Sequence, residues 1–132
     1  VLVVDHDPAA LTATAALLGK WGLEVTCAAS LAESRAAMPQ PPDIALMDYR
    51  LDGAERGDAT YAALCEAWGA RPPVILLTAE SSEETEAAAA RMAANRLLKP
   101  APPAALRALI ATALAQGRAE AADQALAESA TG

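Results

Sequence analysis

The stretch VLVVDHDP, residues 1–8, joins a short apolar run to an acidic cluster and a proline. The run from Val1 to Val4 is typical of a strand that is covered on both faces of a parallel sheet. Asp7 and Pro8 then predict a helix, because Asp is a favoured N-cap and proline suits the first helical position. Asp5 is left at the carboxyl end of the strand, where open α/β sheets bind their ligands.

The alternation of strand and helix repeats along the chain. Strands are predicted at residues 1–4, 23–27, 44–47, 74–77 and 96–98, and helices at residues 8–21, 30–38, 59–68, 81–93 and 102–117. The alternating apolar and polar residues of 23–27 are typical of a strand at the edge of a sheet. This order predicts an α/β, flavodoxin-like fold with a doubly wound, five-stranded parallel sheet in the order 2-1-3-4-5 and right-handed crossovers.

Local signals mark two helix ends. Residues 81–84 read Ser-Ser-Glu-Glu and have the Ser-x-x-Glu spacing of a capping box, so the fourth helix should begin there. Gly117 should close the fifth helix, because glycine is favoured just past a helix end. We therefore expect one domain over residues 1–117 and a tail or linker helix over residues 118–132. The tail is too short for an output domain, and the chain starts inside its first strand without an initiator methionine, so a piece of a longer protein is expected.

Composition limits the classes of function. A chain of 132 residues is long enough for one domain with its own core. The net charge of −7 and a pI near 4.6 argue against nucleic acid or an anionic membrane as a partner of the bulk surface. No apolar run approaches the roughly 20 residues that span a bilayer and no leader opens the chain, so a cytoplasmic protein is expected. Cys27 and Cys65 lack the spacing of a zinc or redox site and are expected to be buried free thiols.

Three chemically active residues stand where predicted strands stop. Asp5 follows the first strand, Asp48 the third, in IALMDYR, and Lys99 the fifth, in RLLKPAP. In the order 2-1-3-4-5 the first and third strands flank the switch point, so their carboxyl ends meet at one edge of the sheet. Two carboxylates and one ammonium at this edge suit a hard divalent cation and a phosphate group.

The motifs around these residues together resemble the receiver domain of bacterial two-component signalling. VLVVDHDP is similar to the acidic motif of the first strand, IALMDYRL to the phosphoacceptor strand, VILLTAE to the fourth strand with its hydroxyl residue, and LLKP to the fifth-strand lysine. The resemblance spans about residues 1–117 and implies the (βα)5 receiver fold. The Tyr-Arg pair after Asp48, with the LDG that follows, resembles receivers attached to hybrid sensor histidine kinases.

The resemblance implies a role for each acidic residue. Asp48 would take a phosphoryl group from the phosphohistidine of a histidine kinase or phosphotransfer domain. Mg²⁺ would be held by Asp5, Asp48 and the backbone carbonyl of Arg50, with water completing its octahedron. Without the ion the two carboxylates repel each other, so one of them should have a raised pKa.

The resemblance also implies which groups handle the phosphate and carry the signal. Lys99 would pair with the phosphoryl oxygens, and the Thr78 hydroxyl and the backbone N–H of Ala79 would donate to them. Thr78, drawn inward, would shift the segment from Glu83 to Ala115. Such a receiver phosphorylates itself and slowly loses the group to water, so it is not an enzyme that turns over a substrate. Homodimer formation is left open.

Two positions depart from the family pattern. His6 stands where receivers carry a second acid that touches the metal, and imidazole is a poor ligand for Mg²⁺ although it suits Zn, Ni or Cu. The ion is then held by Asp5 and Asp48 with more water, or another cation is favoured, or His6 is structural. Arg96 stands where receivers place an aromatic that swings with the threonine; its guanidinium can pair with carboxylates instead. The coupling from Asp48 to the surface would be altered or reduced.

Two other functions compete with the phosphoacceptor. A pseudo-receiver would keep the fold as an interaction module that works without phosphorylation, and His6 and Arg96 favour it. A phosphohydrolase of the haloacid dehalogenase type would use Asp5 as nucleophile and Asp7 as acid/base. That family needs another acidic pair after its lysine, and none follows Lys99 before the predicted fifth helix.

Overall fold

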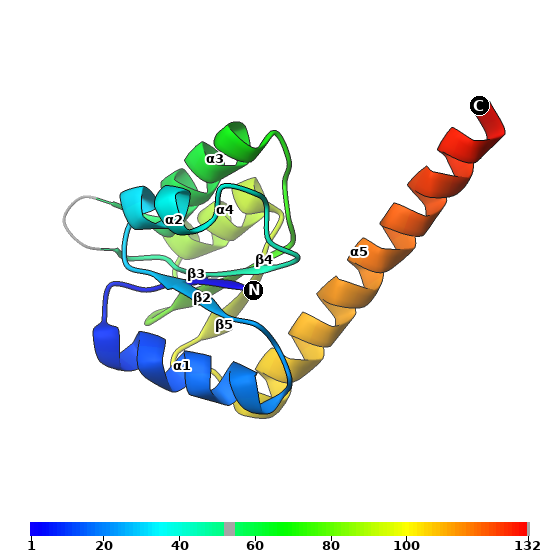
Figure 1. The fold of residues 1–132 in the computed structure, drawn as a ribbon. Helices are drawn as coiled ribbons and strands as arrows, with labels where there is room; N and C mark the ends of the chain where they lie inside the picture. Colours follow the sequence, from blue (N-terminus) through cyan, green and yellow to red (C-terminus); the bar gives the residue numbers. More distant parts are fainter. Residues whose placement is uncertain (52–54, 132) are drawn as a thin grey trace.

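The computed structural model describes the backbone of residues 1–51 and 55–131, and the side chains of residues 1–51 and 55–117. Strands and helices alternate along these residues (Figure 1). The strands are β1 (Leu2–Val4), β2 (Thr26–Ala28), β3 (Ala45–Asp48), β4 (Val74–Thr78) and β5 (Asn95–Leu98). The helices are α1 (Pro8–Lys20), α2 (Leu31–Ala37), α3 (Gly57–Trp68), α4 (Glu83–Met92) and α5 (Pro103–Thr131).

The strands form one parallel sheet in the order β2-β1-β3-β4-β5, which confirms the predicted fold. Val4 pairs with Met47, and Thr78 at the end of β4 pairs with Leu98 at the end of β5. Because the register aligns the carboxyl ends, the residues that leave β1, β3, β4 and β5 emerge at the same edge.

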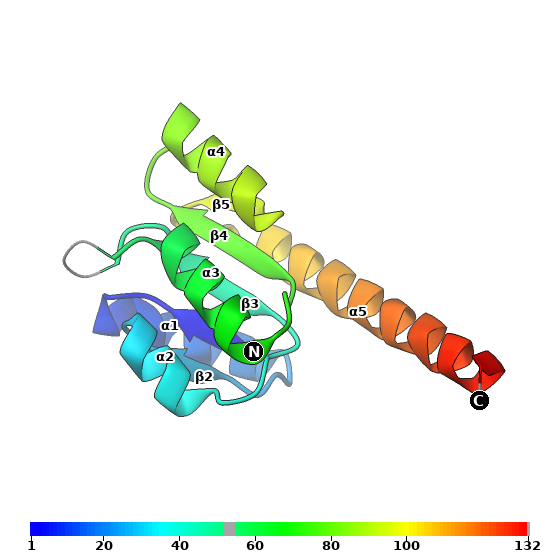
Figure 2. The same ribbon diagram turned by 90° about the horizontal axis from the view of Figure 1, so that it is seen from above.

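Helices cover both faces of the sheet, as Figures 1 and 2 show. Helices α1 and α5 pack on one face, and α2, α3 and α4 pack on the other. On β3, Leu46 belongs to the core shared with α1 and α5, whereas its neighbours Ala45 and Met47 belong to the core shared with the other helices. Strands buried on both faces explain why the runs around Val3, Leu46 and Ile75 are apolar throughout.

Strand β2 lies at the edge of the sheet, as predicted, but it spans Thr26–Ala28 rather than 23–27. The backbone N–H of Leu23 donates to the carbonyl of Leu18 at 3.2 Å and so belongs to the end of α1. Pairing with β1 starts only at Thr26, whose N–H donates to the carbonyl of Val1 at 2.8 Å. Cys27 is exposed on this edge strand, so the prediction that it is buried is wrong, whereas Cys65 is buried.

The helix starts follow capping signals, with one shift. Asp7 accepts a hydrogen bond from the N–H of Ala9 at 3.0 Å, as its predicted role of N-cap for α1 requires. At α4 the capping box joins Ser82 and Thr85 instead of Ser81 and Glu84. Ser82 has the extended backbone of an N-cap, and the threonine hydroxyl at the third helical position accepts the N–H of Ser82.

Helix α5 continues past Gly117, where the sequence predicts its end, and reaches Thr131. A glycine inside a helix costs roughly 1 kcal/mol relative to alanine, which a long helix tolerates when no proline follows. Leu106, Ile110 and Ala113 are buried against the sheet, and the later turns project away from it (Figure 1). Among the helices of the described residues, none has the length and apolar character that crossing a bilayer requires.

Candidate functional site

The predicted site residues come together at the carboxyl edge of the sheet. Asp5 follows β1, Asp48 ends β3, Thr78 ends β4 and Lys99 follows β5. The backbone N–H of Lys99 donates to the carbonyl of Thr78 at 2.7 Å, which ties the two neighbouring strand ends together. The peptide bond from Lys99 to Pro100 is cis.

One ammonium group bridges the two carboxylates. The Nζ atom of Lys99 lies 2.8 Å from Oδ2 of Asp5 and 3.2 Å from Oδ2 of Asp48. Asp5 is 4% exposed and Asp48 is 5% exposed, so both carboxylates are largely removed from water. Buried carboxylates are costly unless they are paired, and a single lysine compensates only one of the two negative charges. The site therefore has a net negative charge that a cation would offset.

The two carboxylates differ in how readily they take a proton. Burial raises the pKa of Asp48, and although Lys99 opposes this, the charge of Asp5 adds to it, so the pKa of Asp48 lies above its ordinary value. Burial also acts to raise the pKa of Asp5, but hydrogen bonds from Lys99 and from the N–H of Asp7 outweigh it and lower that pKa. The prediction that one of the pair has a raised pKa is confirmed, and Asp48 is that residue.

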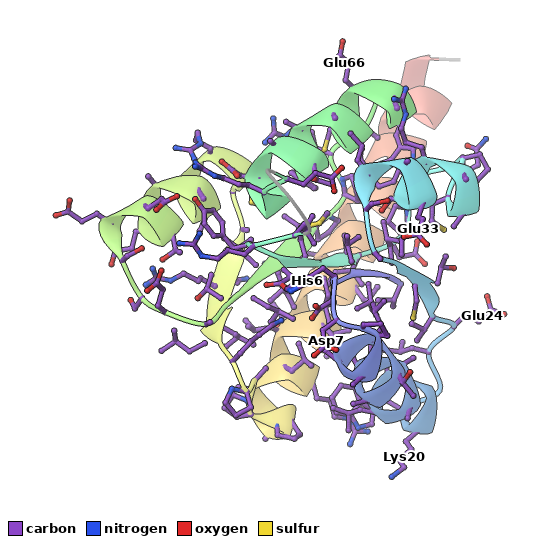
Figure 3. The ribbon with its side chains drawn as sticks, turned by 90° about the vertical axis from the view of Figure 1, so that its left-hand side faces the viewer. His6, Asp7, Lys20, Glu24, Glu33 and Glu66 are labelled. Carbon is purple, nitrogen blue, oxygen red and sulfur yellow. The ribbon has the colours of Figure 1, made fainter. Side chains whose placement is uncertain are left out.

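His6 lies beside the carboxylates, at the point where β1 leads into α1 (Figure 3). Its Nδ1 atom is 3.3 Å from Oδ2 of Asp48 and 3.7 Å from Oδ1 of Asp5. The His6 side chain is 47% exposed, so one side of it is open to solvent. Among the described residues, Asp5, His6 and Asp48 form a group whose ligand atoms all lie within 4.8 Å of one another, a separation that a metal ion can bridge.

A pocket of about 170 Å³ opens next to Asp48. It is lined by residues at or just after the ends of β1, β3, β4 and β5 and by Thr85 of α4: His6, Asp48, Tyr49, Arg50, Thr78, Ala79, Glu80, Thr85 and Lys99. The Thr78 hydroxyl is buried and has no hydrogen-bond partner among the described residues. Because a buried polar atom without a partner is unfavourable, this hydroxyl is suited to a ligand in the pocket. The roles of the Arg50 carbonyl and the Ala79 N–H stay predictions.

The start of α4 is attached to the site by a network that no sequence motif indicates. The buried hydroxyl of Tyr49, directly after Asp48, donates to Oε1 of Glu84. Nη1 of Arg56 lies 3.4 Å from the same oxygen. Burial and the hydrogen bond to Glu84 both raise the pKa of Tyr49. In the sequence the tyrosine is only a family signal, and no pattern pairs it with a glutamate 35 residues away.

Arg96, in β5, contacts the first turn of α4 as well. Its Nη1 atom donates to the Thr85 hydroxyl at 2.9 Å, and its Nη2 atom lies 3.5 Å from Oε1 of Glu86. The predicted pairing of this arginine with a carboxylate is therefore confirmed. Arg96 holds the first turn of α4, just after the loop that leaves Thr78.

Gly57 begins α3 two residues before the predicted start, because its backbone packs directly on β3. The N–H of Gly57 donates to the carbonyl of Tyr49 at 2.7 Å. A β-carbon at this position would lie 2.4 Å from the backbone oxygen of Asp48 and 3.0 Å from Cγ of Met47. Only glycine lets the backbone of α3 come this close to β3. The contact helps to fix the position of Asp48 at the end of that strand.

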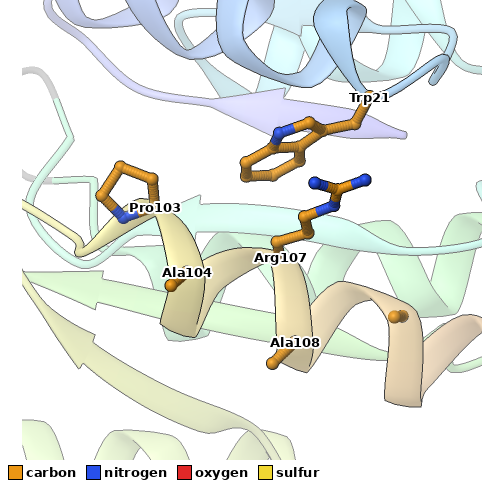
Figure 4. A pocket seen from close by; sticks show the side chains of 6 residues that line it. Trp21, Pro103, Ala104, Arg107 and Ala108 are labelled. Carbon is orange, nitrogen blue, oxygen red and sulfur yellow. The ribbon is translucent and has the colours of Figure 1, made fainter.

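A larger groove of about 410 Å³ lies elsewhere, between the end of α1 and the start of α5 (Figure 4). The Arg107 guanidinium stacks over the Trp21 ring at 5.6 Å from its centroid. Pro103, Ala104 and Ala108 complete much of the lining. This groove lacks carboxylates, and among the described residues it holds no buried polar atom without a hydrogen-bond partner.

Three of the solved structures that share this fold are covered over nearly their whole length. The CheY-like response regulator receiver domain protein from Methanospirillum hungatei is 26% identical, with a TM-score of 0.80 over 90% of this chain and 95% of that one. The BeF3-activated N-terminal receiver domain of Klebsiella pneumoniae RstA is 31% identical, with a TM-score of 0.71 over 86% of this chain and 96% of that one. The signal receiver domain of a modulated diguanylate cyclase from Desulfovibrio desulfuricans is 28% identical, with a TM-score of 0.76 over 90% and 95%.

A family model gives the same result from sequence. No match was found among curated proteins. The model of the response regulator receiver domain, in contrast, matches residues 1–111, which is most of the chain. Strand order, matched length and the acidic edge agree, and the chain belongs to the family of response regulator receiver domains.

Proposed function

We propose that this receiver domain accepts a phosphoryl group on Asp48 from the phosphohistidine of a histidine kinase or phosphotransfer domain. The observation that carries the proposal is the buried Asp48 carboxylate, which meets the Lys99 ammonium beside the unpartnered Thr78 hydroxyl in one pocket. Receiver domains are phosphoacceptors and not enzymes that turn over a substrate, so the chemistry is a single transfer followed by slow loss to water.

In the transfer step, an oxygen of Asp48 forms a bond to phosphorus as the bond from phosphorus to the donor imidazole breaks. The electron pair of that bond returns to the imidazole nitrogen. Lys99, at 3.2 Å from Asp48, favours the ionised form of the carboxylate and then offers its charge to the incoming phosphoryl oxygens. The Thr78 hydroxyl gains the hydrogen-bond partner that it lacks without a phosphate.

A divalent cation fits the negative charge left over at the site. In this family the expected ion is Mg²⁺, which Asp5, Asp48 and the Arg50 carbonyl would hold and which would neutralise the negative charge of the phosphoryl group. Asp5 is already oriented for this role, because the N–H of Asp7 donates to its Oδ1 at 3.0 Å.

The signal would leave through α4, β5 and α5. The backbone N–H of Lys99 donates a hydrogen bond to the carbonyl of Thr78, and the loop after Thr78 leads into the first turn of α4. Movement of the threonine toward a phosphate would strain the contacts that Arg96 and Tyr49 make with this turn. Arg96 replaces the usual aromatic, so the switch would depend on a hydrogen bond and not on a swinging ring.

A pseudo-receiver is the alternative with an observation in its favour. His6 approaches Asp48 to 3.3 Å, and Arg96 is already engaged with Thr85, so an unphosphorylated chain has its own set of contacts. The phosphohydrolase alternative is disfavoured, because it needs Asp7 as acid/base and this carboxylate is engaged in capping α1.

Phosphorylation of the full chain with acetyl phosphate and a divalent cation, read by intact mass, tests the proposal. The wild-type protein should gain one phosphoryl group, Asp48→Asn should gain none, and Asp43→Asn, at an exposed position outside the site, should match wild type. No labelling of any of the three, together with failure to bind beryllofluoride, would favour the pseudo-receiver.

Four wider expectations also stay proposals. The domain would end at residue 117, with residues 118–132 as a linker helix. The chain would be cytoplasmic, and it would be the receiver of a hybrid histidine kinase. It would contact neither nucleic acid nor membrane itself.

A further inference from the structure

We infer that His6 is a metal ligand and that, together with Asp5 and Asp48, it makes the cation site prefer a late first-row transition-metal ion over Mg²⁺. The inference rests on the proposed function in one respect, since the ion occupies the site where the phosphoryl group would arrive. It changes which cation that site selects.

Two of the three separations between the donor atoms are close to those of ligands around one ion. Nδ1 of His6 lies 3.3 Å from Oδ2 of Asp48 and 3.7 Å from Oδ1 of Asp5. Two atoms bound to the same ion at about 2.0–2.2 Å are about 3 to 3.5 Å apart in tetrahedral or octahedral geometry. All three ligand atoms lie within 4.8 Å of one another, so small movements of the exposed imidazole and of the carboxylates would bring them onto a single cation.

Lys99 leaves room for this ion. On Asp5 the ammonium contacts Oδ2, at 2.8 Å, while Oδ1 faces His6. The N–H of Asp7 donates to the same Oδ1 and fixes the direction in which it points. The lysine and the metal ion would thus use different oxygens of Asp5 and meet only at Asp48.

Ligand chemistry decides which ion is preferred. Mg²⁺ binds oxygen ligands and keeps a strict octahedron, so a nitrogen in place of a carboxylate oxygen weakens it. Imidazole is a good ligand for Co²⁺, Ni²⁺, Cu²⁺ and Zn²⁺, whose affinities for mixed nitrogen and oxygen sites follow the Irving–Williams series. With two carboxylates and one imidazole, the site retains enough oxygen for Mg²⁺ to bind but gives the transition metal an additional favourable ligand.

A second observation indicates that the pocket is built for a ligand. The Thr78 hydroxyl is buried, lines the same pocket and has no partner among the described residues. Thr78 is 1% exposed, so its hydroxyl is almost fully removed from bulk water. A hydrated cation, or the group that it brings, would satisfy the hydroxyl.

The competing explanation is that protonated Nδ1 of His6 simply donates a hydrogen bond to Asp48. That explanation makes the imidazole a local structural contact and predicts no effect on the choice of ion. The chain contains a single histidine, so every imidazole signal and every nitrogen ligand from a side-chain imidazole reports on His6 alone.

The test uses the full chain without an affinity tag, because a histidine tag would bind the same ions. Cys27→Ser serves as the background, since Cys27 is the exposed thiol and thiolates also bind transition metals. Co²⁺ and Mg²⁺ are titrated separately by calorimetry into this protein and into His6→Asp and His6→Asn in the same background. Thermal unfolding of each variant shows that it is folded.

Loss of an imidazole ligand should lower the ratio of Co²⁺ to Mg²⁺ affinity by about 10-fold to 100-fold in His6→Asp, with the larger part of the change in the Co²⁺ affinity. His6→Asn should lose Co²⁺ affinity without the gain in Mg²⁺ affinity that a third carboxylate brings. In the His6 protein, Zn²⁺ should also shift the Nδ1 resonance of the single imidazole.

Equal affinity ratios in the His6 and His6→Asp proteins would overturn the inference, as would a Nδ1 resonance that no ion moves. Both measurements are made without a phosphodonor. A protein that binds Co²⁺ through His6 but is not phosphorylated in the presence of any ion therefore refutes only the proposed function. A protein that is phosphorylated but whose choice of ion does not depend on His6 refutes only this inference.

Discussion

Replacement of Gly57 by alanine should destabilise the domain, although alanine is the better helix former. In an exposed helix this change is stabilising by roughly 0.5–1 kcal/mol, because glycine loses more backbone entropy on folding. At Gly57 the new β-carbon would meet the backbone oxygen of Asp48 at 2.4 Å and the Cγ atom of Met47 at 3.0 Å. The first of these neighbours is backbone and cannot turn away.

The size of the effect follows from the atoms that must move. Adding a methyl group to a well-packed interior costs about 1–3 kcal/mol, which exceeds the gain in helix propensity. Relief would require α3 to shift away from β3, and this shift would stretch the hydrogen bond of 2.7 Å from Gly57 to Tyr49. The strand end that carries Asp48 would move with it, so phosphorylation should slow as well.

Urea unfolding at neutral pH measures the change. With a slope of about 1–3 kcal/mol per molar urea, a loss of about 2 kcal/mol lowers the midpoint by roughly 1 M. Gly19→Ala is the matched control, since nothing lies within 4 Å of a β-carbon there and the residue is in α1. The control should be neutral or stabilising. A Gly57→Ala protein as stable as its Gly19→Ala counterpart would show that the backbone of α3 does not approach β3 this closely.

Three further outcomes follow from the site. Asp48→Asn should raise the urea midpoint at pH 7. The pKa of Asp48 is higher in the folded protein than in the unfolded chain, so its contribution to stability is full below the unfolded pKa of about 3.9 and is lost as the pH rises through the folded pKa. The neutral asparagine does not lose stability in this way. The gain should shrink toward pH 4, and a lower midpoint at pH 7 would contradict burial and repulsion from Asp5 as its cause. Tyr49→Phe removes the hydroxyl that binds Glu84 and should cost about 0.5–1.5 kcal/mol, measured by the same unfolding, with no loss expected if the contact is absent in solution. Arg96→Ala should speed amide hydrogen exchange in the first turn of α4 and leave exchange in α1 unchanged, because the hydrogen bond to Thr85 is lost. An equal change of the exchange rates in both helices would contradict this prediction.

The sheet and the acidic edge were predictable because each depends on local signals. Val1 to Val4 is a short apolar run, and Asp7 with Pro8 defines a helix start that the structure bears out. Strand order then brings Asp5 and Asp48 together without any knowledge of side-chain contacts. The receiver motifs reinforced this prediction at four separate points of the chain.

The parts that failed depend on competition between neighbours. Ser82 prevailed over Ser81 as the cap of α4 because Thr85 completes the box, while Glu84 is engaged by Tyr49 from the end of β3. Leu23 reads as a strand residue, yet its N–H closes the end of α1. Gly117 has the chemistry of a helix stop but lies where no left-handed turn is required. Such outcomes depend on tertiary contacts that a single sequence does not display.

Helix α5 continues without a break from the domain to Thr131. Thr131 lies about 27 Å beyond Ala113, the last buried residue among the described side chains, at about 1.5 Å of rise per residue. Each residue also turns the helix by about 100°, so inserting one residue after Ala113 would redirect that end by more than a quarter of a circle. The rotation of α5 about its axis, and not only its length, would then decide which partner surface near Thr131 is coupled to the pocket beside Asp48.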